Sequence, residues 1–559
     1  MRVLVVPAQR WERPLPGAGA SDSEDGCSSI VVSSDMDAST RTTTLILLLI
    51  VAALSGCSQP PPETTPDRLR EVTLLYTNDF ESAYDPIPAF WRDDLGHVGG
   101  IAQLATLIDE VRAEEELSFL LDAGDIFTGT LAKLTRGELP FEIMITMDYD
   151  AMCIGNHEFE YGWWVLRDAM QRAPFPVLAA NLFYEGTEIP FTQQWTILER
   201  DGFRIGVVGI FGPDAATALF PPHLEGLEVR DPVAAARTAV ARIREEVDLV
   251  VLLTHEGKTA PMQTDDEADA TVHRDIDADI ALAGAVPGVD VLIGGHADAG
   301  QEEPFIHPVT GTLICQTYGQ GTRLGYLKLL IDPESGEIVG HDGRLLVVAS
   351  DELAPQPVVA AKLAAYRARF PEVDEIIGRT AGRLTRRYNE ESDLGSLFAD
   401  ILREHGETNI AFVHSGGIRA DLPAGDITRE DLLDAFPFVD FVTTLRMTGE
   451  QILNVLEQSF SLERGVLQVS GMTVIYDLER PIGERVVAVN IGSEPLDPGA
   501  TYTVATLDFL ASGADLYSGF LGAAVIIAQG PEFAELLEAH FATGEPVAAP
   551  EGGRLIPVR

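Results

Sequence analysis

Positive charge is scarce in this chain, and lysine is scarcest of all. The 559 residues carry 39 Lys and Arg against 87 Asp and Glu, a formal net charge of −48. A surface of this sign repels phosphate backbones, which argues against a protein that binds nucleic acid polymers through phosphate contacts. We interpret the acidity as a solvated surface. Only four lysines are present, and no function follows from their scarcity: Lys133, Lys258, Lys328 and Lys362.

Cysteines and long apolar runs are also few. Four cysteines are too few for a disulfide framework in a chain of this length: Cys27, Cys57, Cys153 and Cys315. The apolar run LILLLIVAAL at 45–54 is too short to span a bilayer as a helix. It leads into Leu54-Ser55-Gly56-Cys57, which resembles the lipobox of bacterial lipoproteins, where the peptide is cut before the cysteine and the cysteine receives lipid. An ordinary signal peptide and a short buried helix are the alternatives.

The N-terminal segments predict an export signal followed by a tether. Residues 1–35 do not look like part of a targeting signal, and we interpret them as a non-native upstream extension or a disordered segment, with translation starting at Met36. A genuine, unusual extension is the alternative. Residues 36–57 form the predicted lipoprotein signal peptide, with Cys57 as the lipidation site, and the Pro- and Thr-rich residues 58–70 form a tether. This predicts a bacterial cell-envelope protein, attached to a membrane by its lipid anchor and facing the periplasm or the exterior.

Two folded domains are predicted after the tether, because 559 residues are long for one domain and comfortable for two. In residues 71–345, short apolar runs alternate with amphipathic stretches, which is typical of buried strands in a layered α/β domain. Examples are VTLLYT, LSFLLDA, DAMCIG, RIGVVGIF, DLVVLLT and VDVLIGG. The Pro-delimited segment PQPVVAAKLAAYRARFPEV predicts a linker helix within 346–373. A second α/β unit is expected at 374–545, with a tail at 546–559.

Polar residues that can bind metals follow five of the predicted strands. In open α/β sheets, ligands gather at the carboxyl ends of the strands. One Asp or His after a strand is most often a turn residue or a cap, whereas five segments that deliver such residues to one edge predict a converging metal site. The residues are Asp79 and Glu81, Asp125, Asn156 and His157, His255, and His296 and Asp298.

These segments resemble a known family. TNDFES, GD, GNHEFE, THEG and GGHAD are similar to the five blocks of the calcineurin-like metallophosphoesterases, in the version of the bacterial 5'-nucleotidase and UDP-sugar hydrolase family. The resemblance implies a four-layer β-sandwich flanked by helices, a linker helix and a second α/β domain that binds substrate. It also implies a hydrolase in which two divalent metal ions, bridged by one carboxylate, clamp a phosphoryl oxygen while a metal-bound water attacks in line.

Carried over position by position, the resemblance assigns roles in the first domain. Asp125 would bridge both ions. The other ligands would divide into a site with histidines and a site with carboxylates: Asn156, His255 and His296 for the first, and Asp79, Glu81 and Asp298 for the second. His157 would stabilise charge that develops on the phosphate or the leaving oxygen, and Glu160 would orient His157.

Three positions depart from the family pattern. The family usually has His at the position of Glu81, a neutral Gln, Asn or His at that of Asp298, and Asp at that of Glu160. Decay of the site is one interpretation. The other is a change of metal preference, which we call retuning. A decaying site would replace its ligands by residues that bind no metal, whereas both replacements at the metal site are oxygen ligands. Carboxylate-rich sites suit manganese, magnesium or calcium. We therefore expect Mn²⁺ at the carboxylate-rich site and Zn²⁺, Fe²⁺ or Mn²⁺ at the histidine site.

Blocks of the second domain resemble the substrate-binding blocks of the same family. Ser415–Pro423 is similar to the NGGGIR block, whose arginine, here Arg419, would hold the substrate phosphate. Asp393-Leu394-Gly395 is similar to the NLG block, and Arg386 and Arg387 precede it as the family's arginines do.

Two aromatic blocks complete the resemblance. Phe438 and Asp440 lie in a PFGN-like block, and Phe509 and Asp515 lie in the block that carries the second aromatic and its Asp. In relatives the two aromatic rings sandwich the nucleobase, whereas a phenylalanine in an apolar stretch can also belong to the core. His414 and Asp440 stand where the family usually has Asn.

The sequence therefore predicts a surface-anchored, dinuclear metal-dependent phosphoesterase that hydrolyses nucleotides, with a small nucleotide or other phosphoester as its substrate. Three alternatives of the same fold are a 2',3'-cyclic nucleotide phosphodiesterase, a nucleotide-sugar hydrolase and a thiosulfate-releasing hydrolase. The rival of another class is a non-catalytic surface binding lipoprotein, in which Glu81 and Glu160 would mark lost catalysis. Metal-dependent release of phosphate discriminates between the two classes.

Overall fold

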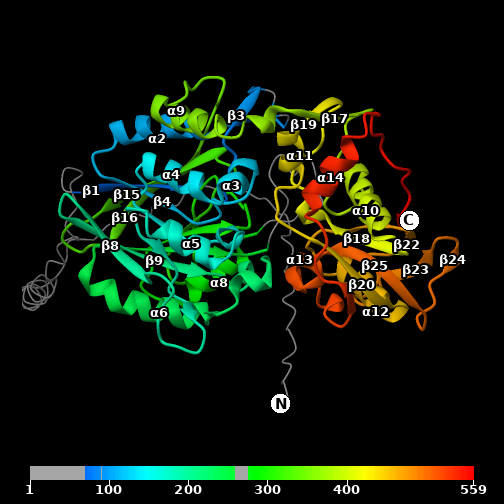
Figure 1. The fold of residues 1–559 in the computed structure, drawn as a ribbon. Coiled ribbons are helices and arrows are strands. Elements are labelled where there is room, and N and C mark those ends of the chain that lie inside the picture. The colour runs from blue at the N-terminus through cyan, green and yellow to red at the C-terminus, as the bar shows by residue number, and fades with distance from the viewer. Residues whose placement is uncertain (1–68, 90, 93, 259–274, 559) are drawn as a thin grey trace, which may run out of the picture. The chain divides into compact units, whose positions relative to one another are not determined.

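The computed structural model of the chain describes residues 69–89, 91–92, 94–258 and 275–558, all within one unit, Pro66–Arg559 (Figure 1). The predicted extension, the signal peptide with Cys57, and the tether up to residue 68 lie outside the described residues. In the part of the chain that is described, no helix is long and apolar enough to cross a membrane.

Two six-stranded sheets form the centre of the first domain. Their strand orders are β16-β15-β1-β4-β5-β6 and β13-β14-β12-β11-β9-β8. Strands β1, β4, β5 and β6 run parallel, as do β9, β11, β12 and β14. The first sheet comprises β1 (Arg70–Thr77), β4 (Ser118–Asp122), β5 (Ala151–Cys153), β6 (Val177–Leu178), β15 (Arg323–Ile331) and β16 (Ile338–Val347). The second comprises β8 (Trp195–Arg200), β9 (Phe203–Phe211), β11 (Leu249–Glu256), β12 (Val291–His296), β13 (Phe305–Ile306) and β14 (Leu313–Cys315).

The two sheets pack face to face, and the apolar runs that predicted strands are the central strands of both. All five residues of β4 and all six residues of β12 are buried. Such continuous runs are expected where both faces of a parallel sheet are covered. Side chains from both sheets meet in one core, which includes Leu74, Phe119, Val207, Leu253 and Ile293.

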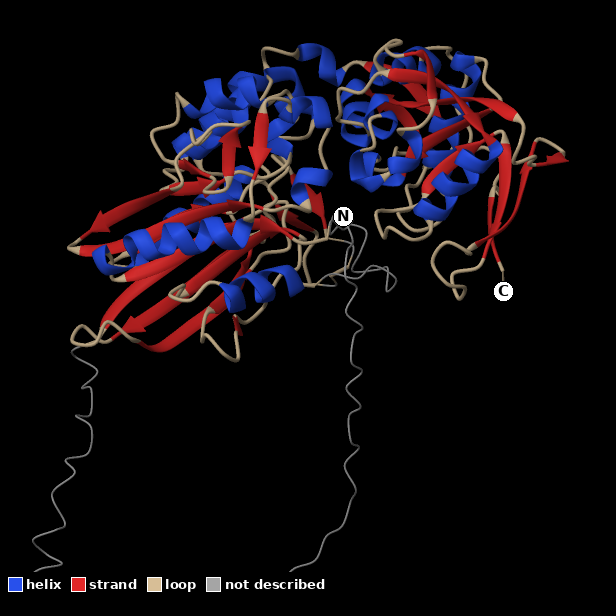
Figure 2. Ribbon diagram, turned by 90° about the horizontal axis from the view of Figure 1, so that it is seen from below, coloured by secondary structure: helices blue, strands red, loops and turns tan. Residues whose placement is uncertain are grey.

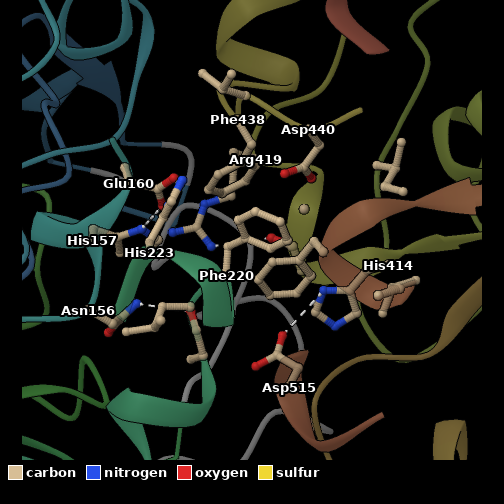
Figure 3. Close-up of a pocket in the computed structure, with 18 of the residues that line it drawn as sticks. Asn156, His157, Glu160, Phe220, His223, His414, Arg419, Phe438, Asp440 and Asp515 are labelled. Carbon is tan, nitrogen blue, oxygen red and sulfur yellow. Dashed lines mark hydrogen bonds and ion pairs between the residues drawn. The ribbon is translucent and has the colours of Figure 1, made fainter. Parts of the chain in front are cut away.

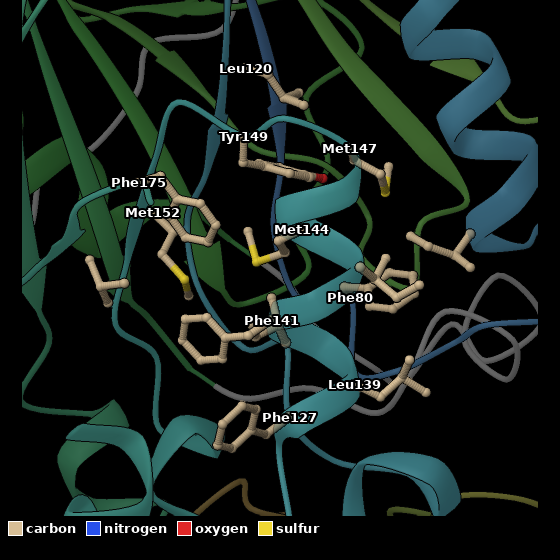
Figure 4. Packing of buried hydrophobic residues seen from close by; sticks show 14 of the residues in the cluster. Phe80, Leu120, Phe127, Leu139, Phe141, Met144, Met147, Tyr149, Met152 and Phe175 are labelled. Carbon is tan, nitrogen blue, oxygen red and sulfur yellow. The ribbon is translucent and has the colours of Figure 1, made fainter. Parts of the chain in front are cut away.

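Helices cover the outer faces of the two sheets (Figure 2). Helices α2 (Ile101–Glu114), α4 (Glu138–Thr146) and α5 (Trp163–Met170) pack on the first sheet, and α6 (Pro232–Ile243) and α8 (Asp277–Ala285) pack on the second. Figure 4 shows Phe141 and Met144 of α4 among Phe127, Met152 and Phe175. The domain therefore has four layers, helices, sheet, sheet and helices, which confirms the expected fold. The smaller elements here are β2 (Pro86–Pro88), β3 (His97–Gly99), α3 (Thr130–Thr135), β7 (Leu182–Tyr184) and β10 (Leu227–Val229).

The predicted connector is helix α9 (Pro357–Arg367). Gln356 caps it by accepting hydrogen bonds from the amides of Val358 and Val359, and proline occupies the first turn, where a missing amide hydrogen does no harm. Val359 and Leu363 join the outer core of the first domain. The connector is therefore packed against the first domain.

The second domain is built on a five-stranded sheet in the order β21-β18-β25-β20-β26. One face packs against α10 (Asp393–Gly406) and α14 (Phe533–Phe541), and the other against α12 (Gly449–Ser459). The strands are β18 (Ile410–His414), β20 (Val442–Thr448), β21 (Leu467–Ser470), β25 (Thr501–Leu507) and β26 (Ala524–Ile527). Smaller elements complete the domain: β17 (Ile376–Thr380), β19 (Gly425–Thr428), α11 (Arg429–Ala435), β22 (Met472–Tyr476), β23 (Val486–Ile491), β24 (Glu494–Pro495), α13 (Asp508–Ala511) and β27 (Leu555–Pro557). The chain is thus a two-domain α/β protein.

Candidate metal and substrate site

The carboxyl ends of the parallel strands carry the predicted metal ligands. Strands β1, β4 and β5 lead into Asp79, Asp125 and Asn156, while β11 and β12 carry His255 and His296 near or at their ends. The strands that bear these residues are neighbours within their sheets. The structure thus brings the strand-end residues of both sheets to one place.

Two groups of potential ligand atoms share Asp125. Asp125, His255 and His296 form one group and Glu81, Asp125 and His157 the other, with the atoms of each group within 4.8 Å of one another. The Nε2 atom of His255 lies 2.9 Å from Asp125 Oδ2 and 3.2 Å from Asn156 Oδ1. The shared carboxylate is Asp125, the residue expected to bridge two ions.

Asp79 and Asp298 border these two groups. Asp79 Oδ1 lies 3.8 Å from His255 Nε2, and both Asp79 carboxylate oxygens accept from the amide of His296 at 2.9 Å. Asp298 Oδ1 lies beside Gly319, where a Cβ atom would come within 2.3 Å of it. A side chain at position 319 would therefore displace Asp298.

The backbone under these ligands is unusual. Five of the predicted ligands have positive φ angles, in the left-handed region that residues other than glycine seldom adopt: Asp79 (49°), Glu81 (46°), Asp125 (63°), His296 (73°) and Asp298 (49°). Such conformations cost free energy, and they persist where the surrounding structure holds them for a function. The turns that aim these side chains are therefore part of the site.

His157 lies on the side of the site that faces the second domain. Its Nδ1 atom is 2.6 Å from Glu160 Oε1, and its Nε2 atom is 3.4 Å from Glu81 Oε1. Its amide donates to Asp125 Oδ1 at 2.8 Å, and its ring stacks on Phe438 with 6.1 Å between the ring centroids. His157 is thus held by carboxylates at both ring nitrogens and by its own backbone.

Burial and proximity perturb the ionisation of these groups. Burial raises the pKa of Asp79 to about 7. Burial alone would lower the pKa of His255, but Asp125 and Asp79 raise it to about 10. Burial would raise the pKa of Glu81, but Arg419 and His157 lower it. A buried group of carboxylates, imidazoles and one amide is the donor chemistry that divalent cations need. The residues present therefore fit divalent metal ions.

The second domain contributes Arg419 to the same place. Its Nη2 atom forms an ion pair with Glu81, and its Nη1 atom donates to the carbonyl of Gly416 at 3.4 Å. The buried Nε of Arg419 has no hydrogen-bond partner among the described residues. This donor remains for a ligand.

Arg419 lies between two cavities. On one side, the wider cavity of about 830 Å³ is lined by Glu81, Arg386, Arg387 and Arg419 among others. The Arg387 side chain is 54% exposed and lies 3.5 Å from Glu390. The two arginines that precede the NLG-like block therefore face the same cavity as Arg419.

The second cavity is an aromatic pocket (Figure 3). Apart from Arg386 and Arg387, it brings the predicted catalytic and substrate residues together with part of the metal site: Asn156, His157, Glu160, Arg419, Phe438, Asp440, Phe509 and Asp515. His414 stacks on Phe509 with centroids 6.1 Å apart and lies 3.4 Å from Asp515 Oδ2. Phe438 and Phe509 are only partly buried, so their rings line the pocket rather than belonging wholly to the core.

Sequence reasoning missed several residues of the site. Glu158 is fully buried and accepts hydrogen bonds from the amides of Asp125, Ile126 and Gly155, so it ties two ligand-bearing loops together. Its place inside the GNHEFE block was the signal for it. Asp214 contacts His296 and Arg464, and no local pattern marks either Asp214 or Arg464.

Comparisons with known proteins find relatives of both domains. The family model described as calcineurin-like phosphoesterase matches residues 94–297, and that of the 5'-nucleotidase C-terminal domain matches residues 376–522. Protein UshA of Yersinia enterocolitica is 28% identical over 500 residues, which cover 81% of this chain and 87% of that protein. A 5'-nucleotidase of Vibrio cholerae is 28% identical over 531 residues, covering 86% and 92%. The crystal structure of a 5'-nucleotidase precursor from Thermus thermophilus is 28% identical, has a TM-score of 0.77, and covers 88% of this chain and 100% of that one.

The four-layer fold, its buried clusters and these matches define a metal-dependent phosphoester hydrolase. More particularly, the chain belongs to the 5'-nucleotidase family, in which a calcineurin-like phosphoesterase domain precedes a 5'-nucleotidase C-terminal domain.

Proposed function

We propose that the chain hydrolyses nucleoside phosphates at a centre of two divalent metal ions. The observation that carries the proposal is that one pocket contains His157 and Asn156 of the first domain together with Arg419, Phe438 and Phe509 of the second. The relatives named 5'-nucleotidase support a nucleotide as substrate. A substrate that spans this pocket would place its phosphate by Arg419 and its base among the aromatic rings.

The ligands would divide between the two ions as the family pattern implies. Asp125 would be shared by both ions, and the remaining ligands would serve one ion each: Asn156, His255 and His296 on one side, and Asp79, Glu81 and Asp298 on the other. Ions held there would supply Lewis acidity and neutralise charge on the phosphoryl group. The carboxylate-rich side suits Mn²⁺, and the histidine side suits Zn²⁺, Fe²⁺ or Mn²⁺.

The side chains around this centre bind the substrate and stabilise developing charge. His157, oriented by Glu160, would donate a hydrogen bond to the phosphoryl or leaving oxygen. Arg419 would bind the phosphate through its unused Nε donor, because a guanidinium can present two parallel N–H groups to such an anion. The side chains of His157 and Arg419 are only 12% and 15% exposed, and this low exposure strengthens both contacts.

The outer wall would recognise the nucleoside. Phe438 and Phe509 would stack on the base, Asp440 and Asp515 would accept hydrogen bonds from the base or the sugar, and Arg386 and Arg387 would add positive charge beside Arg419. Activity of the purified protein with several divalent metals, on AMP and on bis-p-nitrophenyl phosphate, tests the proposal. Failure to release phosphate from AMP, or p-nitrophenol from the diester, under every condition would favour the non-catalytic binding protein instead.

The wider cavity favours a second candidate function. Its volume of about 830 Å³ on the far side of Arg419 leaves room for a second substituent on the phosphate. A nucleotide sugar would use that room, whereas a monoester and a 2',3'-cyclic nucleotide, whose two ester oxygens belong to one ribose, would not. Comparing kcat/KM for AMP, a UDP-sugar and 2',3'-cyclic AMP distinguishes these substrates.

We further propose that the mature chain begins at a lipid-modified Cys57 and is held at the bacterial cell envelope, facing the periplasm or the exterior. The LSGC motif after a short apolar run supports this proposal. Mass spectrometry of the membrane fraction is expected to find no peptide that spans Gly56 and Cys57. Secretion of a Cys57→Ser variant in the same form as the wild type would contradict it.

A further inference from the structure

Asp214 lies between the metal site and the second domain. It follows strand β9, and its two carboxylate oxygens face different partners. Oδ2 lies 3.3 Å from Nε2 of His296, and Oδ1 lies 2.5 Å from Nη2 of Arg464. One carboxylate thus joins a predicted metal ligand of the first domain to a cation of the second.

The contact with His296 bears on how this histidine binds a metal. The His296 side chain is almost fully buried and belongs to the group with Asp125 and His255. A carboxylate that holds a proton on one ring nitrogen of a histidine leaves the lone pair of the other nitrogen for a cation and fixes the orientation of the ring. Asp214 is placed to act on His296 in this way.

Arg464 carries the connection into the aromatic pocket. Its side chain is 3% exposed, and its Nη1 atom lies 3.7 Å from Asp515 Oδ1. Its backbone carbonyl accepts a hydrogen bond from His414 Nε2 at 2.7 Å. His414 and Asp515 both line the pocket proposed for the nucleoside. Arg464 therefore touches two walls of that pocket and, through Asp214, the metal site.

The turn that carries Arg464 has a defined shape. Glu463 and Gly465 on either side of it both have positive φ angles, 56° and 79°. A Cβ atom at Gly465 would lie 3.0 Å from the ring of Tyr388. At position 465, both the positive φ angle and the close approach of Tyr388 therefore favour glycine. This turn holds Arg464 toward Asp214.

A neighbouring ion pair provides a matched comparison. Lys258 Nζ lies 2.6 Å from Glu463 Oε2, and both side chains are mostly exposed, at 58% and 70%. Exposed pairs of this kind contribute little, whereas losing one partner of a buried pair leaves an uncompensated charge. The Asp214–Arg464 pair is the more buried of the two, with side chains 25% and 3% exposed.

We propose that Asp214 and Arg464 form a bridge through which nucleoside binding and metal binding strengthen each other. Asp214 is a positioning residue for His296, and Arg464 transmits the state of the nucleoside pocket to Asp214. Coupling between two binding sites is reciprocal, so an effect of nucleoside on metal affinity equals the effect of metal on nucleoside affinity. The inference rests on the proposed function, because it takes a nucleoside as the ligand of the aromatic pocket.

Metal titration without turnover tests the bridge. Mn²⁺ affinity of the chelator-treated protein is measured by calorimetry in the absence and presence of adenosine. In the wild type, adenosine is expected to tighten Mn²⁺ binding by about fivefold or more, the lower end of usual couplings. Asp214→Asn should weaken Mn²⁺ binding about 10- to 100-fold, as for other residues that orient metal ligands, and should abolish the adenosine effect.

Variants of the partner residue separate the bridge from general damage. Arg464→Met should keep Mn²⁺ binding closer to wild type than Asp214→Asn does, yet remove the adenosine effect, while Arg464→Lys should restore part of it. Lys258→Gln, at the exposed pair, should keep the full effect. Circular dichroism melting curves confirm that each variant is folded.

Two results would overturn the bridge: Mn²⁺ affinity unchanged in Asp214→Asn, or an adenosine effect unchanged in Arg464→Met. If adenosine fails to bind the wild type at all, the nucleoside pocket of the proposed function and the coupling fall together. The role of Asp214 toward His296 is then still decided by the Mn²⁺ titration alone.

Discussion

The two halves of the candidate site are held in place by different kinds of structure. In the first domain, Asp79, Asp125 and His296 lie directly at the ends of buried parallel strands and have left-handed backbone conformations. In the second domain, Phe438 lies in a loop before β20, and Phe509 is in the short helix α13; both are only partly buried. In the proposed function, the first half performs the chemistry and the second half recognises the substrate. Substitutions should therefore damage turnover in the first half and substrate affinity in the second.

The largest effect is expected at Asp125, the residue shared by the two groups of potential metal ligands. Asp125→Asn removes the carboxylate charge that would hold both ions, so turnover should be abolished and metal content should fall. Elemental analysis and phosphate release measure the two quantities. If the Asp125→Asn variant kept the metal content and the kcat of the wild type, Asp125 would not bridge two metal ions.

A smaller loss of rate is expected at His157, which faces the second domain and is not one of the predicted metal ligands. His157→Ala should slow turnover by roughly 100-fold or more, the range for losing a preorganised donor to the transition state, while the metals stay bound. The kcat value and the metal content are measured on the same sample. Full activity with bound metal would remove His157 from the catalytic residues.

In the second half, the effect should appear in KM. Phe509→Ala should raise KM for nucleotides by roughly 5- to 150-fold, the equivalent of about 1–3 kcal/mol for the loss of one stacked base. The KM for p-nitrophenyl phosphate, which has no base, should stay the same. Phe305→Ala, at an exposed position in β13, serves as the control. An equal loss on both substrates would assign Phe509 to the core.

The smallest effect is expected at Glu81, where the two halves of the site touch, and it is a change in the metal that the enzyme prefers. Glu81 belongs to one ligand group and also pairs with Arg419. Glu81→His replaces an oxygen donor by nitrogen, so reactivation of the chelated enzyme should move from Mn²⁺ toward Zn²⁺. Reactivation curves for the two metals give the preference. Full reactivation of the wild type by Zn²⁺ alone, with an unchanged profile in the variant, would refute the retuning interpretation.

The strand-end residues were predictable because they depend on short-range order. Asp125 and His255 each follow an apolar run that is typical of a buried strand, and parallel strands end at a common edge. The block around Arg419 and the aromatic blocks were predicted only from their resemblance to the substrate-binding blocks of the family. The exposure of Phe438 and Phe509 could not be predicted from the sequence, because a phenylalanine in an apolar stretch fits a core equally well.

The sequence by itself therefore determined the two-domain α/β architecture, the connector helix and which residues gather at the sheet edges, because each follows from neighbouring residues. Only the tertiary structure decided that Arg419 pairs with Glu81 and that Asp214 joins His296 to Arg464. Glu81 and Arg419 are 338 positions apart, and Asp214 and Arg464 are 250 apart. Contacts at such separations depend on how two domains pack against each other, which no local pattern of residues encodes.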